Sequence, residues 1–257
     1  MPDMRINLNA DLGEGFGPWQ MGDDAAMLAI VASANIACGG HAGDPDVMRR
    51  TVRLAKQRGV SIGAHPSYPD IQGFGRRAMA LSAAELESQI AAQVGALAGI
   101  AALESEHLTH VKPHGALNNL ACVDRNVADT ICRAMCAINR SLILLAPAAS
   151  QLVAAGRAAG LTVVEEIFAD RAYMPDGQLV PRARPDAMIH GPEACLAHVL
   201  AMLDAGAVIA VDGTPIATPI GSICVHGDNP EAVAVARHLR EQLNARRYRV
   251  VSLPEIA

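Results

Sequence analysis

Short apolar segments alternate with longer amphipathic segments about seven times along the chain. The short segments have the aliphatic composition of buried strands, and the longer ones repeat apolar residues at helical spacing. This alternation is typical of a parallel sheet with right-handed helical crossovers. A length of 257 residues with no linker-like stretch suits one domain over residues 1–257. We therefore predict an α/β fold, an irregular (β/α) barrel of about seven parallel strands, with an open doubly wound sheet as the main alternative.

The helix boundaries are marked by capping signals. Asp44-Pro45 begins one predicted helix, which ends before Gly59, and Ser82 with Glu85 forms a capping box for the next. The predicted strands are residues 4–10, 60–64, 108–111, 142–145, 161–168, 222–225 and 250–253, and the segment 33–45 is predicted to be a short strand, a polar turn and the start of a helix. A small hairpin is expected around Asp212-Gly213. The segments 67–77 and 173–187 are predicted to be long loops.

Ionisable residues follow the predicted strands, at the positions where a parallel barrel or an open α/β sheet builds its active site. These residues are Asp11, His41 with Asp44, His65, Lys112 with His114, Asp170 with Arg171, and His226 with Asp228. Taken singly, a histidine of this kind is more often structural, and Asp44 is explained by its N-cap position. Taken together, the residues predict one polar pocket at the carboxyl ends of the strands.

The residue types in this predicted pocket indicate hydrolysis or ligation of an amide or ester. Histidines and carboxylates act as general acids and bases, or hold a divalent metal. The candidate catalytic residues are Asp11, His41, His65, Lys112, His114 and Asp228, and the candidate metal ligands are Asp11, His41, His65 and His114. The candidates for binding the substrate or a phosphate group are Asn9, Glu14, Asn35, Arg76, Arg77, Asp170, Arg171 and His226. Cys38 is near His41 in sequence, but a buried packing thiol is the better interpretation.

Other classes of function are disfavoured. The net charge is −5 and only 3% of residues are aromatic, so we expect no nucleic-acid partner. No secretory signal is visible, and the uncharged run 141–156 is too short to span a membrane. The six cysteines form no CxxC pair, which favours reduced thiols and a cytoplasmic location. The glycine-rich turn 13–19 lacks the spacing of a nucleotide-binding loop.

Several long motifs of unusual composition follow one another from Asn7 to Pro230: NLNADLGEGFG, SANIACGGHAGDP, GAHPSYPDIQGFGRR, VKPHGALNN, EEIFADRAY and SICVHGDNP. Together they resemble the LamB/YcsF family, the A subunits of 5-oxoprolinases. Gly40 stands where the family usually has Phe, and Asn118 where it usually has Tyr. These two departures lie beside the predicted pocket and leave its ionisable groups in place.

The resemblance implies a glycoside hydrolase/deacetylase-like barrel and ATP-dependent opening of the 5-oxoproline lactam to L-glutamate. It also implies ATP with Mg²⁺ as cofactors and 5-oxoprolinase subunits B and C as partners. Two other functions remain open: a stand-alone metal-dependent deacetylase or amidohydrolase, and a non-catalytic binding protein for a small metabolite. Tightly bound zinc with ATP-independent activity would favour the first of these, and binding without turnover the second. A homo-oligomer is compatible with all three functions.

Overall fold

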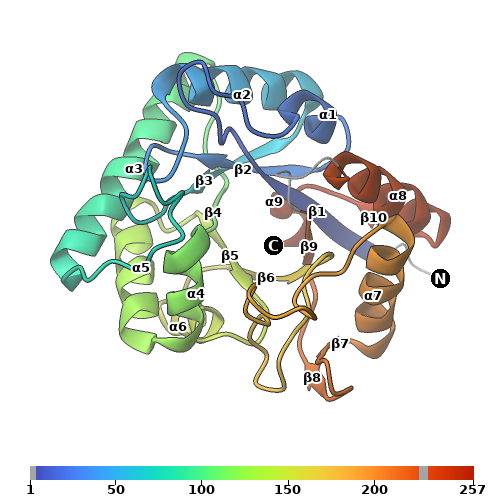
Figure 1. Cartoon of the computed structure of the whole chain (residues 1–257). Coiled ribbons are helices and arrows are strands. Elements are labelled where there is room, and N and C mark those ends of the chain that lie inside the picture. Colours follow the sequence, from blue (N-terminus) through green and yellow to red (C-terminus); the bar gives the residue numbers. More distant parts are fainter. Residues whose placement is uncertain (1–3, 226–230) are drawn as a thin grey trace.

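The computed structural model of this protein describes residues 4–225 and 231–257, and these form a closed parallel barrel (Figure 1). Its seven strands are β1 (Met4–Leu12), β2 (Ser33–Ala37), β3 (Ser61–His65), β4 (His110–Val111), β5 (Ile143–Pro147), β6 (Val163–Phe168) and β9 (Ser222–Val225). Pairing of β1 with β9 closes the barrel. A further strand, β10 (Tyr248–Val250), pairs in parallel with the beginning of β1. The predicted barrel is confirmed, and the open-sheet alternative is wrong.

Helices surround the barrel (Figure 1). In the described part of the chain they are α1 (Asp24–Leu28), α2 (Pro45–Arg58), α3 (Ala83–Leu103), α4 (Gly115–Val123), α5 (Arg125–Ile138), α6 (Gln151–Ala158), α7 (Pro192–Ala205), α8 (Ala232–Ala245) and α9 (Leu253–Ile256). The capping predictions hold: Asp44 accepts from two backbone N–H groups at the start of α2, and Ser82 with Glu85 caps α3. The hairpin is also present, as β7 (Ala207–Ile209) paired with β8 (Pro215–Ala217).

Two segments differ from the sequence prediction. Residues 115–123, for which the sequence predicted no element, form α4, whose start at His114 has no side-chain cap to mark it. The predicted strand at 250–253 is wrong, because β10 ends at Val250 and α9 begins at Leu253. Ser252 and Glu255 form a capping box, which favours a helical turn over an extended strand at this point.

α3 is the one helix of the described residues that is long and apolar enough to cross a membrane, by length and composition alone. Its mean hydropathy is 1.3, and a third of its most apolar window is buried. Leu86, Ile90 and Val94 form its buried stripe, and the helix packs against α2 and α5. A single buried stripe is typical of an amphipathic helix on the outside of a barrel.

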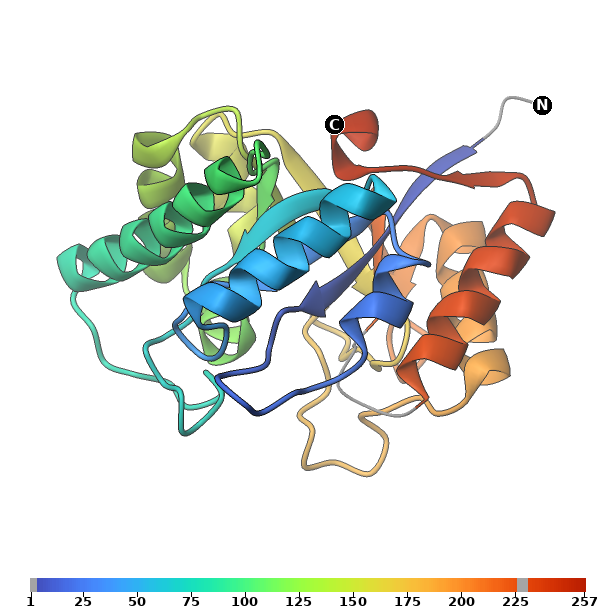
Figure 2. The ribbon, with the colours of Figure 1, turned by 90° about the horizontal axis from the view of Figure 1, so that it is seen from above.

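The interior of the barrel is polar. Asn9 on β1 donates to Glu166 on β6, Asn35 on β2 donates to Asn9, and the His110 ring on β4 lies 3.0 Å from the Asn35 amide oxygen. Gly63 on β3 makes room for this ring, because a Cβ there would lie 2.2 Å from it. These buried groups form a hydrogen-bonded floor below the loops, which gather at one end of the barrel (Figure 2).

Candidate active site

A pocket of about 490 Å³ opens at the carboxyl ends of the strands. It is lined by residues at the ends of five of the strands or just after them, including Asp11, His65, Lys112, His114, Phe168 and Arg171. The structure therefore gathers side chains that are far apart in the sequence, as expected for the active-site end of a (β/α) barrel.

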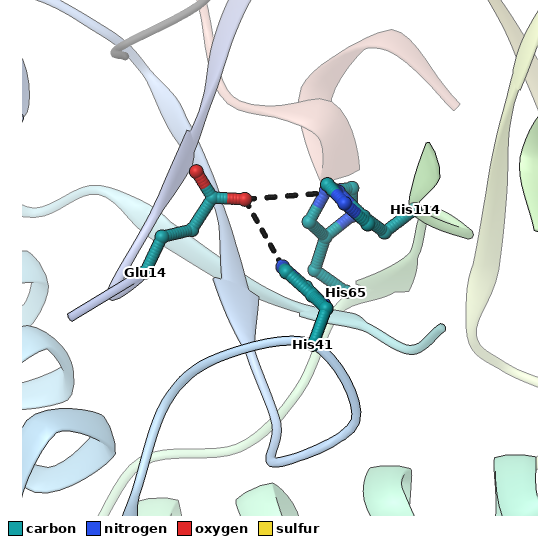
Figure 3. A group of neighbouring side chains, drawn as sticks. All are labelled: Glu14, His41, His65 and His114. Carbon is teal, nitrogen blue, oxygen red and sulfur yellow. Dashed lines mark hydrogen bonds and ion pairs between the residues drawn. The ribbon is translucent and has the colours of Figure 1, made fainter. Parts of the chain in front are cut away.

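Glu14, His41, His65 and His114 form a compact group beside this pocket (Figure 3). One possible ligand atom from each residue lies within 4.8 Å of all the others. Glu14 Oε1 is 3.0 Å from His41 Nε2 and 3.6 Å from His114 Nδ1. The rings of His41 and His114 stack with centroids 3.6 Å apart. We call these four residues the Glu–His cluster.

Backbone carbonyl groups fix the proton positions on two of the rings. His65 Nδ1 lies 2.7 Å from the Lys112 carbonyl oxygen, and His114 Nε2 lies 2.9 Å from that of Phe74. Because a carbonyl only accepts, both of these nitrogens carry hydrogen. In the neutral rings, Nε2 of His65 and Nδ1 of His114 are then bare lone pairs, and they face each other at 3.0 Å. Such a pair needs a cation between its members, either a proton or a metal ion.

The Glu–His cluster fits a divalent metal ion. Burial lowers the pKa of His114 to about 3, and burial with the neighbouring His114 and His65 lowers the pKa of His41 well below its ordinary value. Both rings are neutral at pH 7, which is the form that binds metals. His41 Nδ1 is buried without a hydrogen-bond partner among the described residues. Three imidazole nitrogens and one carboxylate are a donor set that suits zinc and similar ions.

Asp11 links the Glu–His cluster to a buried ammonium group. Its Oδ2 lies 3.3 Å from His65 Nε2, and its Oδ1 accepts from Lys112 Nζ at 3.0 Å. Lys112 Nζ is also 3.2 Å from Glu166 Oε2 and 3.0 Å from Cys224 Sγ. Burial disfavours the charge on Lys112, but Asp11, Cys224 and Glu166 outweigh it and raise the lysine pKa well above its ordinary value. The pocket therefore has at its base an ammonium group that stays charged and is paired with carboxylates.

The loop after β1 holds Glu14 in place. Asp24 Oδ2 accepts from Gly13 N and from Thr51 Oγ1, each at 3.1 Å. Gly43 N donates to the Gly15 carbonyl oxygen at 2.9 Å, which ties this loop to the one that bears His41. The backbone on both sides of Glu14 is thus anchored by partners on other elements.

Two glycines are required by close packing around the site. Gly75 has φ +62°, and a Cβ there would lie 2.9 Å from both His114 Cδ2 and His41 Cβ. A Cβ on Gly40 would lie 2.3 Å from Gln93 Oε1. The Gln93 side-chain amide forms two hydrogen bonds with the backbone of Ser67. It accepts from the N–H group at 2.9 Å and donates to the carbonyl oxygen at 2.7 Å. Gly40 therefore leaves space for this amide.

The other predicted residues lie in different places. Asn9 and Asn35 are in the hydrogen-bonded floor, and Arg76 lines the pocket. Arg77 does not line the pocket, because its guanidinium group pairs with Asp70, with Nε 3.0 Å from Oδ1.

Asp170 is buried beside Arg171, which does line the pocket. His226 and Asp228 lie outside the described residues. Cys38 is buried, which raises its pKa to about 12 and agrees with a packing thiol.

Sequence reasoning missed two residues of the site. Glu166 is fully buried next to Lys112, and the signal for it was an acidic pair inside the apolar strand VVEEIF. Arg182 lines the pocket, from a proline-broken loop whose sequence gives no hint of this position. Asn118, one of the two departures from the family pattern, does lie at the pocket, and its Oδ1 is buried without a hydrogen-bond partner among the described residues.

Known proteins resemble this chain over nearly its whole length. A protein named as the A subunit of 5-oxoprolinase, from Azoarcus sp. (strain BH72), is 58% identical over 253 residues, covering 98% of this chain and 99% of that protein. A second protein with this name, from Methylococcus capsulatus (strain ATCC 33009 / NCIMB 11132 / Bath), is 56% identical over 248 residues, covering 96% of this chain and 95% of that protein.

Solved structures agree with these relatives. The crystal structure of a lactam utilization protein from Thermus thermophilus matches with a TM-score of 0.91 and 42% identity, covering 97% of this chain and 100% of that one. The catalytic domain of a peptidoglycan N-acetylglucosamine deacetylase from Eubacterium rectale ATCC 33656 matches with a TM-score of 0.52 and 12% identity, covering 100% of this chain and 91% of that one. This second likeness confirms the deacetylase-like fold and nothing more. Because the LamB/YcsF family matches residues 6–257, this chain belongs to the LamB/YcsF family.

Proposed function

We propose that this chain is the A subunit of an ATP-dependent 5-oxoprolinase, a cyclic amide hydrolase that opens the 5-oxoproline lactam to L-glutamate. The main support is one structural observation. The Asp11 carboxylate, the buried Lys112 ammonium group and the Glu–His cluster, which could hold a metal ion, lie together at one end of a single pocket. Relatives at 56–58% identity that bear the name of the 5-oxoprolinase A subunit support the same conclusion.

The residues at the base of the pocket suit hydrolysis of an amide. Asp11 is placed to take the proton from an attacking water molecule as the water oxygen bonds to the lactam carbonyl carbon. The positive charge of Lys112 stabilises the negative charge that develops on the carbonyl oxygen. Protonated Asp11 then gives this proton to the ring nitrogen as the carbon–nitrogen bond breaks, which leaves the amino group of glutamate.

A divalent ion is proposed as a resident of the Glu–His cluster, held by Glu14, His41, His65 and His114. When bound, such an ion supplies Lewis-acid polarisation of a carbonyl group or of a water molecule. His65 and His114 present their lone pairs to this position because the Lys112 and Phe74 carbonyl groups hold the opposite ring nitrogens.

ATP, Mg²⁺ and two further subunits complete the proposal. A five-membered lactam is a stable amide, and transfer of the γ-phosphoryl group of ATP to its carbonyl oxygen, with release of ADP, would make the carbonyl carbon more electrophilic. Addition of water and cleavage of the carbon–nitrogen bond would then give an acyl phosphate, which a second water molecule would hydrolyse to the carboxylate and inorganic phosphate. Arg76 lines the pocket and is a candidate contact for a phosphoryl group.

The names of the relatives mark them as one subunit of several, which implies an assembly. We propose subunits B and C as the partners and the cytoplasm as the location. Roles for Arg77, His226 and Asp228 stay predictions.

Reconstitution tests this function. The full chain is assayed alone and together with purified subunits B and C, with 5-oxoproline and Mg-ATP, for release of glutamate and ADP. We expect glutamate from the three-component mixture and a loss of at least about 100-fold with Asp11→Asn or His114→Ala. The control is His107→Ala, an exposed histidine outside the pocket. A complete mixture that releases no glutamate, or variants as active as wild type, would contradict the proposal.

The Glu–His cluster also favours a second candidate, a stand-alone metal-dependent amidohydrolase. This function predicts about one equivalent of tightly bound metal and amide hydrolysis without ATP or partner subunits. Chelation would abolish that activity. The same assay separates the two candidates, because only the first requires ATP for glutamate release.

A further inference from the structure

A second group of charged residues lines the same pocket. Arg171 and Arg182 belong to the loop between β6 and α7, and Arg76 belongs to the loop between β3 and α3. Guanidinium groups remain cationic at any physiological pH. Three of them on one pocket create a region that favours an anion.

Arg171 has hydrogen-bonding capacity that the described chain does not use. The residue is only 6% exposed. Its Nη2 donates to the Val180 carbonyl oxygen at 2.8 Å, but its Nε is buried without a hydrogen-bond partner among the described residues. An orphaned buried N–H costs free energy, and buried polar groups are almost always paired. An acceptor brought by a ligand would satisfy this group.

The backbone around Arg171 is held from several sides. Its carbonyl oxygen lies 3.0 Å from His198 Nε2 on α7. The next residue, Ala172, donates to the Ala187 carbonyl oxygen and accepts from Val180 N. The backbone of Arg171 also forms an isolated antiparallel β-bridge with Met188 of the same loop. The guanidinium group is thus presented by a cross-linked loop, which limits the entropy lost when a ligand binds.

The local charges agree with an anionic ligand. Burial, together with the neighbouring Arg182 and Arg76, lowers the pKa of Arg171 to about 10, while Asp170 acts in the opposite direction. The group still carries its charge at pH 7. An anion placed among these arginines would relieve both the repulsion between them and the burial cost.

We propose that Arg171 and Arg182 form the subsite for the carboxylate of the lactam substrate. This proposal rests on the proposed function and deepens it, because it names the group that distinguishes 5-oxoproline from an uncharged lactam. The shared chemistry is an oxyanion held by guanidinium forks, which carboxylates and phosphoryl groups both satisfy. We assign the carboxylate, since the reacting carbonyl group belongs near Lys112 and Asp11.

The two ends of the proposed site belong to one pocket. The Phe168 ring lies 5.4 Å from Lys112 Nζ, and Lys112, Phe168 and Arg171 all line this pocket. A single ligand with a carbonyl group at one end and a carboxylate at the other is therefore the kind of molecule that this lining favours.

Calorimetry on the full chain tests the subsite with two lactams, 5-oxoproline and 2-pyrrolidinone, which lacks the carboxylate. We expect Arg171→Gln to weaken 5-oxoproline binding about 10- to 100-fold and to leave 2-pyrrolidinone binding unchanged. Arg182→Gln should weaken 5-oxoproline in the same direction. Arg171→Lys keeps the charge without the fork and should have an intermediate effect. The matched control is Arg184→Gln in the same loop, where the arginine pairs with Asp186 away from the pocket.

Each outcome decides the proposal. Unchanged 5-oxoproline affinity in folded Arg171→Gln, equal losses for both lactams, or no binding of 5-oxoproline to wild type would overturn it. Inorganic phosphate and acetate serve as competitors. If phosphate displaces 5-oxoproline much better than acetate, and does so only when Arg171 is present, the subsite belongs to a phosphoryl group and the carboxylate assignment is wrong. If 5-oxoproline binds through Arg171 but the complete mixture makes no glutamate, the subsite stands and the proposed function fails.

Discussion

Nε2 of His65 and Nδ1 of His114 face each other at 3.0 Å, while each ring turns its other nitrogen to a backbone carbonyl group. A proton between them would place a charge on one of two buried rings, and burial holds the pKa of His114 at about 3. A divalent ion would be held without such a charge on either ring, by His65, His114 and the nearby Glu14 carboxylate. The pair is therefore arranged as a metal site is, with its ring orientations set from outside the site.

Metal binding should depend on this pair of histidines. We expect wild type to bind about one equivalent of zinc, and His114→Ala to lose at least about 100-fold in affinity. Zinc titration against a competing chelator measures the affinity, and elemental analysis after dialysis measures the stoichiometry. His107→Ala, which removes an exposed histidine, should bind like wild type. Equal affinities for the two variants would contradict a metal at this position.

Asp24 should act on the site through the backbone at Gly13. Asp24→Ala removes the acceptor of two partly buried hydrogen bonds and should lower the free energy of unfolding by about 1–3 kcal/mol. It should also weaken metal affinity, because Glu14 follows Gly13 directly. Asp24→Asn keeps an acceptor oxygen and should restore most of both properties. Urea denaturation and zinc titration report the two effects, and normal zinc affinity in Asp24→Ala would rule out this positioning role.

Gly75 and Gly59 offer a matched pair of substitutions. Both have positive φ, +62° and +66°, so alanine is strained at either position. A Cβ at Gly75 meets His114 and His41, whereas a Cβ at Gly59 meets nothing within 4 Å. Gly75→Ala should therefore lower the free energy of unfolding by about 1–3 kcal/mol more than Gly59→Ala. It alone should reduce zinc affinity. Equal effects of the two alanines on both measurements would mean that the rings move aside freely.

The buried His110 should make stability depend on pH. Burial, with the nearby charges of Lys112 and His65, lowers its pKa to about 3 in the folded chain, against about 6.5 when unfolded. The unfolded state therefore binds one more proton below pH 6.5, so this stabilising contribution is complete above that pH and is lost as pH falls towards 3. The expected loss between pH 6.5 and 5 is about 1.5 kcal/mol.

Urea denaturation at several pH values measures this slope. His110→Gln should flatten it by about one proton in that window, and the exposed His107→Gln should leave it unchanged. The window lies above the range in which most carboxylates titrate, so histidines dominate it. A His110→Gln variant with the wild-type slope would show that the ring is protonated in the folded chain.

The sequence predicts the barrel and the placement of the pocket because both depend on local patterns. Apolar periodicity locates the strands, capping residues locate α2 and α3, and a polar residue after each strand marks the active-site end. Asp11, His65 and Lys112 could be identified in this way. α4 could not, since its first residues carry no side-chain cap.

The division of roles within the site depends on contacts across the barrel, which a linear pattern does not contain. Glu14 belongs to the group of potential metal ligands because other loops bring histidines to it. Arg76 and Arg77 are adjacent in sequence, yet Asp70 pairs with Arg77, and Arg76 lines the pocket. The need for glycine at position 40 could not be predicted from the sequence either. It comes from Gln93, which is distant in the chain but leaves no space for a Cβ at Gly40.

The pairing of β1 with β9 has a consequence for how the protein is made. Asn9 is translated long before Cys224, its partner in the ladder, and at 5–20 residues per second the delay is roughly 10–40 seconds. During that time β1 has an open edge, and Lys112 lacks the thiol beside it. The buried environment of Lys112 is therefore complete only after the last strand of the barrel has been made and has paired with β1. The cost of removing this ammonium group from water falls at the end of synthesis, when all of its buried partners are present.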